Sequence, residues 1–251
     1  MENFNLTGRV AIVTGGSKGL GAGMALALAR YGADIVVASR NASEGELISK
    51  EIREMGRKSI AVAVDVQNVK SINQMVETVQ REFGRIDILV NNAGVGSAKP
   101  ALSITEEDWE HVLNTNLKGL FFCSQAVAKV MKEQNYGKII NISSVAGTIG
   151  QNMLASYCAS KAGVISLTRT LAKEWSSHNI YVNSIAPSYI KTSLNEAILS
   201  NEQFLNNILS QTPLKRLGEI EDLTGALILL ASKASNYITG QTIYIDGGAL
   251  A

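Results

Sequence analysis

The sequence contains few cysteines. Among 251 residues only Cys123 and Cys158 are present, so the chain has neither a disulfide framework nor the paired spacing of a zinc site. Both thiols lie in apolar, helix-like stretches where free cysteine is usually buried, and we expect both to be buried. This usage fits a reducing compartment, and the sequence offers no metal-ligand set.

Charge is also scarce, and neither sign is in excess. Charged residues make up 18% of the chain, with 23 Lys plus Arg against 22 Asp plus Glu. No segment clusters basic residues with aromatics, so we expect neither nucleic acid nor a membrane as a partner. Because an average soluble domain has about 25% charged residues, part of the surface is predicted to be a subunit interface. We expect a homotetramer that assembles through its long helices.

Long apolar runs are missing as well. The longest runs, such as residues 226–231, are far too short to span a bilayer. Residues 1–9 lack the apolar core of a signal peptide. We therefore expect a cytoplasmic protein.

The sequence instead alternates short apolar runs with helical periodicity. The apolar runs are continuous, as in strands buried on both faces, and cover residues 10–13, 35–38, 60–64, 86–90, 139–142, 180–185 and 242–245. The helical stretches cover 20–31, 42–55, 69–83, 105–134, 153–177 and 222–231. This alternation predicts an α/β fold: a Rossmann-like, doubly wound parallel sheet of about seven strands with helices on both faces.

Domain boundaries are not visible in the sequence. Because no linker or internal repeat divides the chain, we expect one domain over residues 1–251. Residues 188–213 are polar and helix-prone but fall between the last two predicted strands. We expect them to form an insertion that acts as a substrate loop or lid.

A glycine-rich turn joins the first predicted strand to the first predicted helix. Small residues at this place let the backbone approach a pyrophosphate, whose charge is stabilised by free N–H groups and the helix dipole. A tight turn alone also needs glycine, but the position between strand and helix favours dinucleotide binding. The predicted cofactor-binding residues of this turn are Gly15, Ser17, Lys18, Gly19, Leu20 and Gly21.

The second predicted strand ends at Ser39, Arg40 and Asn41, where NAD-binding proteins of this architecture carry an acidic residue for the ribose 2′-hydroxyl. No carboxylate is present there. Arg40, together with Lys18, can instead make charge-assisted bonds to a 2′-phosphate, although an exposed helix-start residue would look the same. We therefore predict NADP rather than NAD as the cofactor, with these three residues at its binding site.

The third and fourth predicted strands also end in polar motifs. Asp65, beside Val66, can accept a hydrogen bond from an adenine amino group or cap the following helix. The fourth strand is followed by Asn92, Ala93 and Gly94, which a simple turn explains equally well. We assign all five residues to the cofactor site.

A group of three residues, Ser144, Tyr157 and Lys161, points to a chemical reaction more specifically than the preceding motifs do. Tyr157 and Lys161 are four residues apart in a helical stretch and share a face, so the ammonium should lower the pKa of the phenol from about 10. A tyrosine so placed can exchange a proton with an alcohol or a carbonyl. Ser144 follows the fifth strand at the ligand-binding edge of the sheet, where it can hold the substrate oxygen.

These motifs, in this order, resemble those of the short-chain dehydrogenase/reductase family. The resemblance covers nearly the whole chain, from the glycines after Thr14 through the motif at 91–94, Asn116 and the catalytic constellation to Asp246-Gly247-Gly248. It implies a dinucleotide-binding and catalytic domain that interconverts a ketone and a secondary alcohol with NADP(H). Hydride would pass between the nicotinamide and the carbonyl carbon.

The resemblance also assigns roles to individual residues. Tyr157 would be the general acid or base, and Lys161 would bind the nicotinamide ribose. Ser144 would hydrogen-bond the reacting oxygen, and Asn116 would hold a water that links Lys161 to solvent. Asn92 and Ala93 would line the cofactor, and the segment with Pro187, Ile190 and Thr192 would anchor its carboxamide.

One position departs from the family pattern. The family usually follows this proline with glycine, whereas this chain has Ser188. A Cβ at a position with a glycine-only conformation would be strained, so we expect strain in the backbone beside the nicotinamide.

Within the family, the sequence looks most like sugar-acid dehydrogenases such as gluconate 5-dehydrogenase and 2-deoxy-gluconate 3-dehydrogenase. The similarity lies in residues 23–26, 174–175, 178–180 and 246–251. The expected substrate is a sugar acid such as gluconate or 5-keto-gluconate. Those relatives often carry a basic pair after the Asn-Asn-Ala-Gly motif, but here Lys99 is the nearest cation for a carboxylate.

Two alternatives remain. A 3-oxoacyl-acyl-carrier-protein reductase would dock its acidic carrier on basic residues, and the corresponding positions hold Asn135 and His178. Three lysines, 129, 132 and 138, can form a different docking patch. A non-catalytic NADP-binding scaffold or redox sensor would be expected to lack Tyr157 or Lys161, and both are present.

Overall fold

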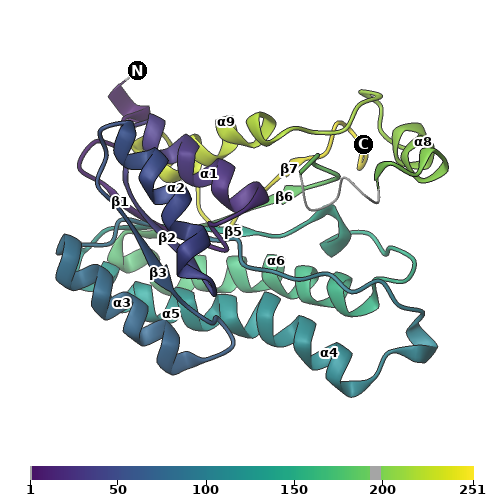
Figure 1. Ribbon diagram of the computed structural model, residues 1–251, viewed down its shortest axis with the longest axis horizontal. Helices are drawn as coiled ribbons and strands as arrows, with labels where there is room; N and C mark the ends of the chain where they lie inside the picture. Colours follow the sequence, from purple (N-terminus) through teal and green to yellow (C-terminus); the bar gives the residue numbers. More distant parts are fainter. Residues whose placement is uncertain (1, 193–198) are drawn as a thin grey trace.

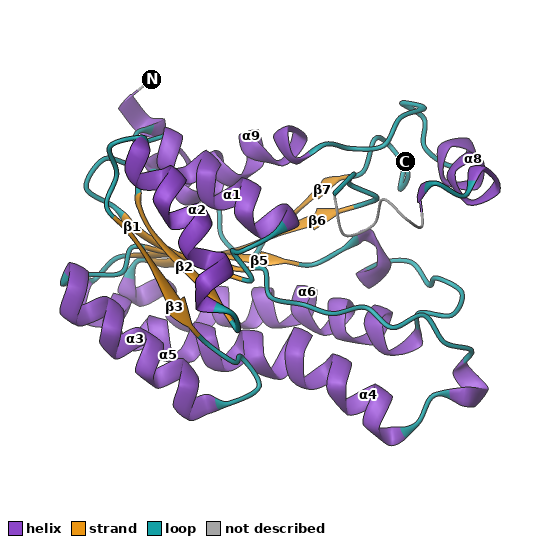
Figure 2. Cartoon of the chain, in the orientation of Figure 1, coloured by secondary structure: helices purple, strands orange, loops and turns teal. Residues whose placement is uncertain are grey.

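A seven-stranded parallel sheet forms the centre of the computed structural model, which describes residues 2–192 and 199–251 (Figures 1 and 2). The strand order is β3-β2-β1-β4-β5-β6-β7. The strands are β1 Val10–Thr14, β2 Asp34–Ser39, β3 Ser59–Ala63, β4 Ile88–Asn91, β5 Gly137–Ile142, β6 Ile180–Pro187 and β7 Thr242–Ile245. The predicted doubly wound sheet is confirmed, and its order reverses between β1 and β4, where such folds bind ligands.

Helices cover both faces of the sheet, as predicted (Figure 1). One face carries α1 Gly19–Arg30, α2 Ala42–Glu54 and α9 Ile220–Ala231. The other carries α3 Val69–Phe83, α4 Glu106–Leu113, α5 Leu120–Gln134 and α6 Ala155–Trp175. A further helix, α8 Glu202–Ser210, lies beyond the carboxyl ends of β6 and β7.

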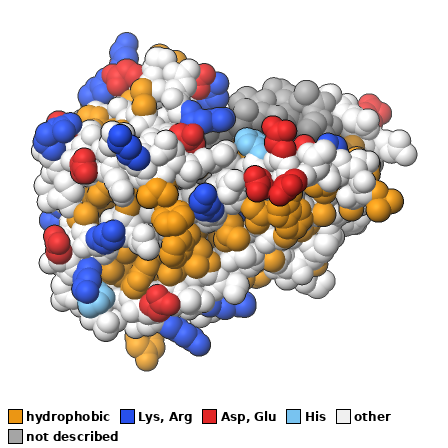
Figure 3. Space-filling view, turned by 90° about the horizontal axis from the view of Figure 1, so that it is seen from below, with side chains coloured by type: hydrophobic (Ala, Val, Ile, Leu, Met, Phe, Trp, Pro, Cys, Tyr) orange, Lys and Arg blue, Asp and Glu red, His pale blue; other side chains and the backbone are white. Residues whose placement is uncertain are grey.

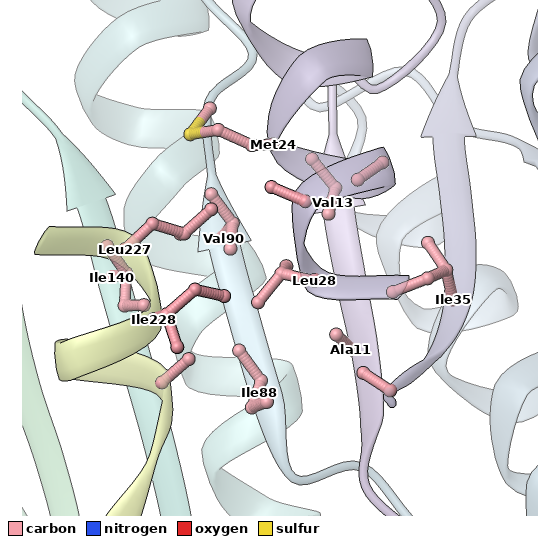
Figure 4. Packing of buried hydrophobic residues seen from close by; sticks show 14 of the residues in the cluster. Ala11, Val13, Met24, Leu28, Ile35, Ile88, Val90, Ile140, Leu227 and Ile228 are labelled. Carbon is pink, nitrogen blue, oxygen red and sulfur yellow. The ribbon is translucent and has the colours of Figure 1, made fainter. Parts of the chain in front are cut away.

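The continuous apolar runs are explained by burial on both sides of the sheet. In β1, Ala11 and Val13 belong to the cluster under α1 and α9, whereas Val10 and Ile12 belong to the cluster over α3 and α5. Figure 4 shows the first cluster, where Leu28 of α1 lies on the side of Ile228 of α9, over the sheet. Because the central strands are packed between two helical layers, their carboxyl ends are held together at one edge of the sheet.

The predicted continuous helix over residues 105–134 is wrong in one respect. It starts as expected, because Thr105 Oγ1 accepts the Asp108 N–H at 3.2 Å and the Asp108 side chain bonds back to the Thr105 N–H at 2.9 Å. Between α4 and α5, however, the π-helical turn η3, Asn114–Gly119, interrupts the α-helix. Such turns add a residue to the helix and often occur at functional sites, and this one contains Asn116.

The predicted insertion over residues 188–213 is only partly described. It contains α8, whose N-terminus is capped by the Asn201 side chain accepting the Phe204 N–H at 3.0 Å. Tyr189, just after β6, packs edge-on against Phe204 of α8, with ring centres 5.9 Å apart. Residues 193–198 lie outside the described residues.

The two cysteines differ in burial. Cys123 is fully buried in α5, and burial raises the pKa of its thiol to about 12. Cys158 is only half-buried, against our expectation, because it lies at the margin of the buried face of α6. Within the described residues, no helix is long and apolar enough to cross a membrane.

The predicted docking patch of three lysines is also wrong, because Lys138 is a core residue with 0% of its surface exposed. Its Nζ donates to Ser235 Oγ at 3.0 Å and lies 3.7 Å from the centre of the Tyr181 ring. Burial lowers the pKa of this ammonium to about 7. Lys129 and Lys132 are exposed on α5, so they alone remain of the patch.

Candidate active site

A cavity of about 540 Å³ opens at the carboxyl ends of the strands, beside the point where the strand order reverses. Many of the predicted site residues share its wall: Gly15, Lys18, Leu20, Gly21, Asn92, Ala93, Gly94, Ser144, Tyr157, Lys161, Pro187, Ile190 and Thr192. The structure therefore brings the glycine-rich turn and the catalytic constellation to one site.

The glycine-rich turn needs its glycines. Gly15 and Gly19 have φ angles of +64° and +53°, which residues with a Cβ rarely adopt. A Cβ on Gly21 would lie 2.1 Å from the Gly15 carbonyl oxygen, so only hydrogen fits between the turn and α1. The backbone is therefore packed to leave a cradle without side chains along the cavity.

The N-terminus of α1 faces this cradle without a side-chain cap. Its N-cap residue, Lys18, makes no capping hydrogen bond. In contrast, α2 and α3 are capped by Asn41 and Asn68. The first N–H groups of α1 thus remain available, with the helix dipole behind them, for an anion such as a pyrophosphate.

The end of β4 is bonded directly to the glycine-rich turn. Thr14 Oγ1 accepts the N–H groups of Asn92 and Ala93, both at 3.1 Å. The Asn92 Nδ2 group donates to the carbonyls of Thr14 at 3.0 Å and Gly15 at 3.1 Å. Asn92 therefore fixes the shape of the turn, a role that a simple turn motif would not have.

The other predicted cofactor residues do not line this cavity. Ser17 and Gly19 belong to the turn. Ser39 is the last residue of β2, Arg40 and Asn41 follow it, and Asp65 and Val66 follow β3. Arg40 is exposed and makes no ion pair within the described part of the chain. Lys18 Nζ lies 2.7 Å from Glu44 Oε1 of α2.

Asp65 and Asn41 have local roles as well. Asp65 Oδ1 accepts the Gln67 N–H at 3.0 Å, but the cap of α3 is Asn68, so the predicted alternative of a helix cap is wrong for Asp65. Asn41 accepts the Ser43 N–H at 3.1 Å and thereby caps α2. Both side chains therefore stabilise the turns that directly follow β2 and β3.

Ser144, Tyr157 and Lys161 meet at the inner end of the cavity. Ser144 is the N-cap of a short helical turn after β5, and its Oγ accepts the Ala146 N–H at 3.1 Å. Lys161 is buried in α6, and its Nζ donates to the Ile142 carbonyl at 2.8 Å. That ammonium lies 5.5 Å from the centre of the Tyr157 ring. The spacing of four residues therefore does place the two side chains together.

The expected lowering of the Tyr157 pKa is not found. Burial raises the pKa of this phenol, a hydrogen bond with Ser144 opposes the rise, and the nearby Tyr189 phenol adds to it. Burial also lowers the pKa of Lys161 to about 8. The prediction failed because helical spacing shows proximity but not the desolvation of both groups. Burial of Tyr157 therefore favours the protonated phenol.

Asn116 is tied into the site from the π-helical turn. Its Oδ1 accepts the Val95 N–H at 2.8 Å, and its Nδ2 donates to the Val95 carbonyl at 2.9 Å and to Ser160 Oγ at 3.1 Å. Ser160 Oγ in turn donates to the Tyr157 carbonyl at 2.7 Å. Asn116 thus connects the loop after β4 to the helical turn that carries Tyr157.

The strain expected at Ser188 is absent. Ser188 is not among the residues with positive φ, so its Cβ is accommodated without a glycine-only conformation. Its N–H donates to the Ile245 carbonyl at 3.0 Å, which continues the pairing of β6 with β7. Serine at this position therefore requires no glycine-only backbone conformation.

Sequence reasoning missed several residues of the cavity wall, among them Gln151, Leu154 and Tyr189. Gln151 and Leu154 precede α6, and the Gln151 amide makes no side-chain hydrogen bond to any described residue. The sequence marks them only by position, because they lie between Ser144 and Tyr157, two residues predicted to be catalytic. Tyr189 lies next to Ile190, which the resemblance had singled out.

Lys99 is not free in the structure. Its Nζ is paired with the Asp108 carboxylate, which also belongs to the capping box of α4. The hydrogen bond from Lys99 lowers the pKa of the Asp108 carboxyl group. The nearest cation named from the sequence is therefore already engaged by a carboxylate of the chain itself.

A parallel α/β sheet with a glycine cradle and a Ser-Tyr-Lys constellation in one cavity defines a Rossmann-like dehydrogenase or reductase. Residues 15–249 match the family model described as enoyl-(acyl carrier protein) reductase. The chain belongs to the short-chain dehydrogenase/reductase family and is an oxidoreductase of that family, so the resemblance seen in the sequence is confirmed.

Individual relatives match along their full lengths. The chain is 44% identical to 2-dehydro-3-deoxy-D-gluconate 5-dehydrogenase of Escherichia coli, over 100% of this chain and 99% of that protein. It is 42% identical to a 3-oxoacyl-[acyl-carrier-protein] reductase of Synechocystis, over 97% of both chains. A crystal structure of a gluconate 5-dehydrogenase from Burkholderia cenocepacia, in complex with NADP and tartrate, superimposes with a TM-score of 0.96 at 36% identity, covering 99% of this chain and 97% of that one.

Proposed function

We propose that the protein interconverts a ketone and a secondary alcohol of a sugar acid with NADP(H). The observation that carries this proposal is the presence of Ser144, Tyr157 and Lys161 in one cavity with the glycine cradle. When bound, the nicotinamide supplies or accepts the reducing equivalent at the reacting carbon. The residues of the chain then have to hold the reacting oxygen and move one proton.

Tyr157 is the proposed proton donor in the direction of reduction. Burial raises the pKa of its phenol and so favours the protonated form, which can give its proton to the oxygen as negative charge develops there. Ser144 Oγ donates a hydrogen bond to the same oxygen. Oxidation reverses both steps, with Tyr157 accepting the proton of the alcohol. Lys161 retains donors beyond its bond to Ile142 for the ribose hydroxyls.

The proposed cofactor is NADP(H). The fit rests on the side-chain-free cradle at Gly15 and Gly21 and on the uncapped N-terminus of α1. Arg40 and Lys18 are the cations that we assign to the 2′-phosphate, and the gluconate 5-dehydrogenase relative was crystallised with NADP. Ser39, Asn41, Asp65 and Val66 complete the adenosine end in this proposal.

A sugar acid is the proposed substrate. Relatives over the full chain length are dehydrogenases of gluconate and of its keto-deoxy derivative. With Lys99 engaged by Asp108, we assign the polar end of the substrate to the neutral donors Gln151 and Tyr189, which line the cavity next to Tyr157. Residues 188–213 are the proposed substrate loop.

Turnover with a panel of ketones tests this assignment. The expected result is NADPH oxidation with 5-keto-gluconate or a keto-deoxygluconate, and none with an acetoacetyl thioester. NADPH and NADH are each supplied at equal enzyme concentration, and the absorbance of the reduced nicotinamide is followed. Turnover of the thioester alone would replace the sugar-acid proposal by fatty-acid chemistry. Binding of NADPH without any turnover would favour the scaffold or redox-sensor alternative.

The alternative 3-oxoacyl-acyl-carrier-protein reductase is supported by one observation, the 42% identity to the Synechocystis enzyme. Against it stands the burial of Lys138, which leaves Lys129 and Lys132 as the cations of the suggested docking patch. An acidic carrier needs a complementary basic surface, so the sugar-acid assignment is preferred.

Replacing Arg40 by Asp is expected to lower the preference for NADPH over NADH at least about tenfold, because a charge-assisted bond is exchanged for repulsion. The ratio of kcat/KM for the two cofactors measures the effect. Arg30, at the exposed end of α1, offers a control for the same change of charge. An unchanged ratio in Arg40→Asp would remove Arg40 from the phosphate site.

A homotetramer in the cytoplasm is proposed from the surface and the cysteines. Hydrophobic side chains gather on the face seen in Figure 3, on the side of the sheet that carries α4, α5 and α6. An open groove of about 530 Å³ lies between α6 and the segment formed by the end of α4, η3 and the start of α5, and it is lined by apolar side chains such as Leu117, Phe121 and Leu167. Such a surface on the long helices is suited to a second copy of the chain. Two free thiols fit a reducing compartment.

A further inference from the structure

A carboxylate stands among the cations at the proposed 2′-phosphate site. Lys18, at the start of α1, pairs with Glu44, in the first turn of α2, at 2.7 Å. The two side chains are 54% and 36% exposed, so solvent and ligands can reach the pair. Arg40, four residues before Glu44, is also exposed.

The local sequence of α2 would send Glu44 elsewhere. Asn41 is the N-cap, and a glutamate three residues later usually reaches back to the backbone N–H of the cap residue. Here Asn41 does cap the helix through the Ser43 N–H, but the Glu44 carboxylate bonds to Lys18 instead. Glu44 therefore lies toward the glycine-rich turn, on the side where the nucleotide would bind.

We propose that Glu44 sets the cofactor selectivity of the enzyme by opposing the 2′-phosphate. This inference rests on the proposed function, which places Lys18 and Arg40 at that phosphate. Exposed ion pairs are weak, whereas charge-assisted bonds to a doubly charged phosphate are stronger, so the phosphate displaces the carboxylate from Lys18. Binding NADP(H) then breaks one ion pair and leaves a like charge nearby. Binding NAD(H), which lacks this phosphate, does neither.

Glu44 consequently restrains NADP(H) affinity without affecting NAD(H). Lys18 serves as the counterion of Glu44 when NAD(H) is bound and as a phosphate ligand when NADP(H) is bound. A chain with only Arg40 and Lys18 would be committed to NADP(H). Glu44 reduces the difference between the affinities for NADP(H) and NAD(H), so the enzyme can use either cofactor.

The test is equilibrium binding rather than activity. NADP⁺ and NAD⁺ are titrated into the wild-type protein and into Glu44→Gln by isothermal titration calorimetry. Glu44→Gln is expected to tighten NADP⁺ binding about threefold to tenfold, the size of one exposed charge contact, and to change NAD⁺ binding less than about twofold. Raising the salt concentration should shrink the NADP⁺ effect, because exposed charges are screened.

Glu46→Gln is the matched control. Glu46 lies in the same helix and pairs with Arg53, so its replacement changes the net charge equally but leaves Lys18 alone. Equal tightening of NADP⁺ by both variants would reduce the effect to net charge and overturn the proposal. An unchanged or weaker NADP⁺ affinity in Glu44→Gln would also overturn it, as would equal tightening of both cofactors.

The two levels of inference fail separately. A wild-type protein that binds NAD⁺ more tightly than NADP⁺ contradicts the proposed cofactor, whatever Glu44 does. The ratio of NADP⁺ dissociation constants between wild type and Glu44→Gln tests Glu44 whichever cofactor the wild type prefers. Glu44→Gln should tighten NADP⁺ binding less when it is made in a Lys18→Met background than when it is made in the wild-type protein. Equal tightening of NADP⁺ binding in both backgrounds would show that Glu44 acts independently of Lys18.

Discussion

Replacing Tyr157 by Phe is expected to lower kcat by about 100-fold to 10,000-fold, the contribution typical of one positioned general acid or base. The change removes only the hydroxyl. The ring stays beside the Lys161 ammonium, 5.5 Å from its centre, and the cradle at Gly15 and Gly21 is untouched. The Kd for NADPH should therefore change by less than about twofold, because the loss falls on the transition state.

Steady-state reduction of the ketone that gives turnover measures kcat, and fluorescence titration measures NADPH binding. Tyr244→Phe is a suitable control, because the Tyr244 hydroxyl bonds to Thr148 at 2.7 Å outside the cavity wall. It should keep the wild-type kcat. If Tyr157→Phe retained more than about a tenth of the activity, a different group would be the proton donor.

The arrangement of the sheet could be predicted from the sequence because strands that are buried on both faces have continuous apolar runs. β1 and β5 are buried at every residue, and their apolar runs are continuous. β7 lies at the edge of the sheet and is half-exposed, but its apolar run over residues 242–245 was still recognisable. The glycine-rich turn was predictable for a related reason, since its positive φ angles and close contacts require glycine.

The features that escaped prediction depend on contacts between distant segments or on desolvation. The π-helical turn at Asn114–Gly119 adds one residue to a helix whose apolar pattern continues on both sides. The burial of Lys138 depends on Ser235 and Tyr181, which come from other elements. The raised pKa of Tyr157 reflects burial, which a spacing of four residues does not reveal.

Substrate recognition was least accessible to sequence reasoning. Lys99 was visible as a nearby cation, but its pairing with Asp108 was not, because that contact depends on how the loop before α4 folds. Gln151 and Tyr189 carry no motif and enter the site only through the shape of the cavity. A family resemblance assigns roles reliably to residues that perform the shared chemistry, and less reliably to residues that contact the variable part of the substrate.

Replacing Gly21 by Ala is expected to raise the Kd for NADPH about tenfold or more. The new Cβ would lie 2.1 Å from the Gly15 carbonyl oxygen and 2.6 Å from Asn92 Nδ2, so backbone atoms of the turn must move. Overpacking of this kind costs about 1–3 kcal/mol, equivalent to roughly tenfold to 100-fold in a binding constant if the bound turn cannot relax. NADPH titration measures the affinity, and urea unfolding measures the stability.

Gly225→Ala provides the matched control, since Gly225 lies within α9 and an added Cβ there meets no atom within 4 Å. It should raise the free energy of unfolding by up to about 1 kcal/mol through helix propensity and leave NADPH binding unchanged. Wild-type NADPH affinity in Gly21→Ala would show that the turn relaxes away from the Cβ without losing the pyrophosphate. The close approach of Gly21 to Gly15 would then serve helix packing alone, and the cradle would depend on the free N–H groups of α1 rather than on the shape of the turn.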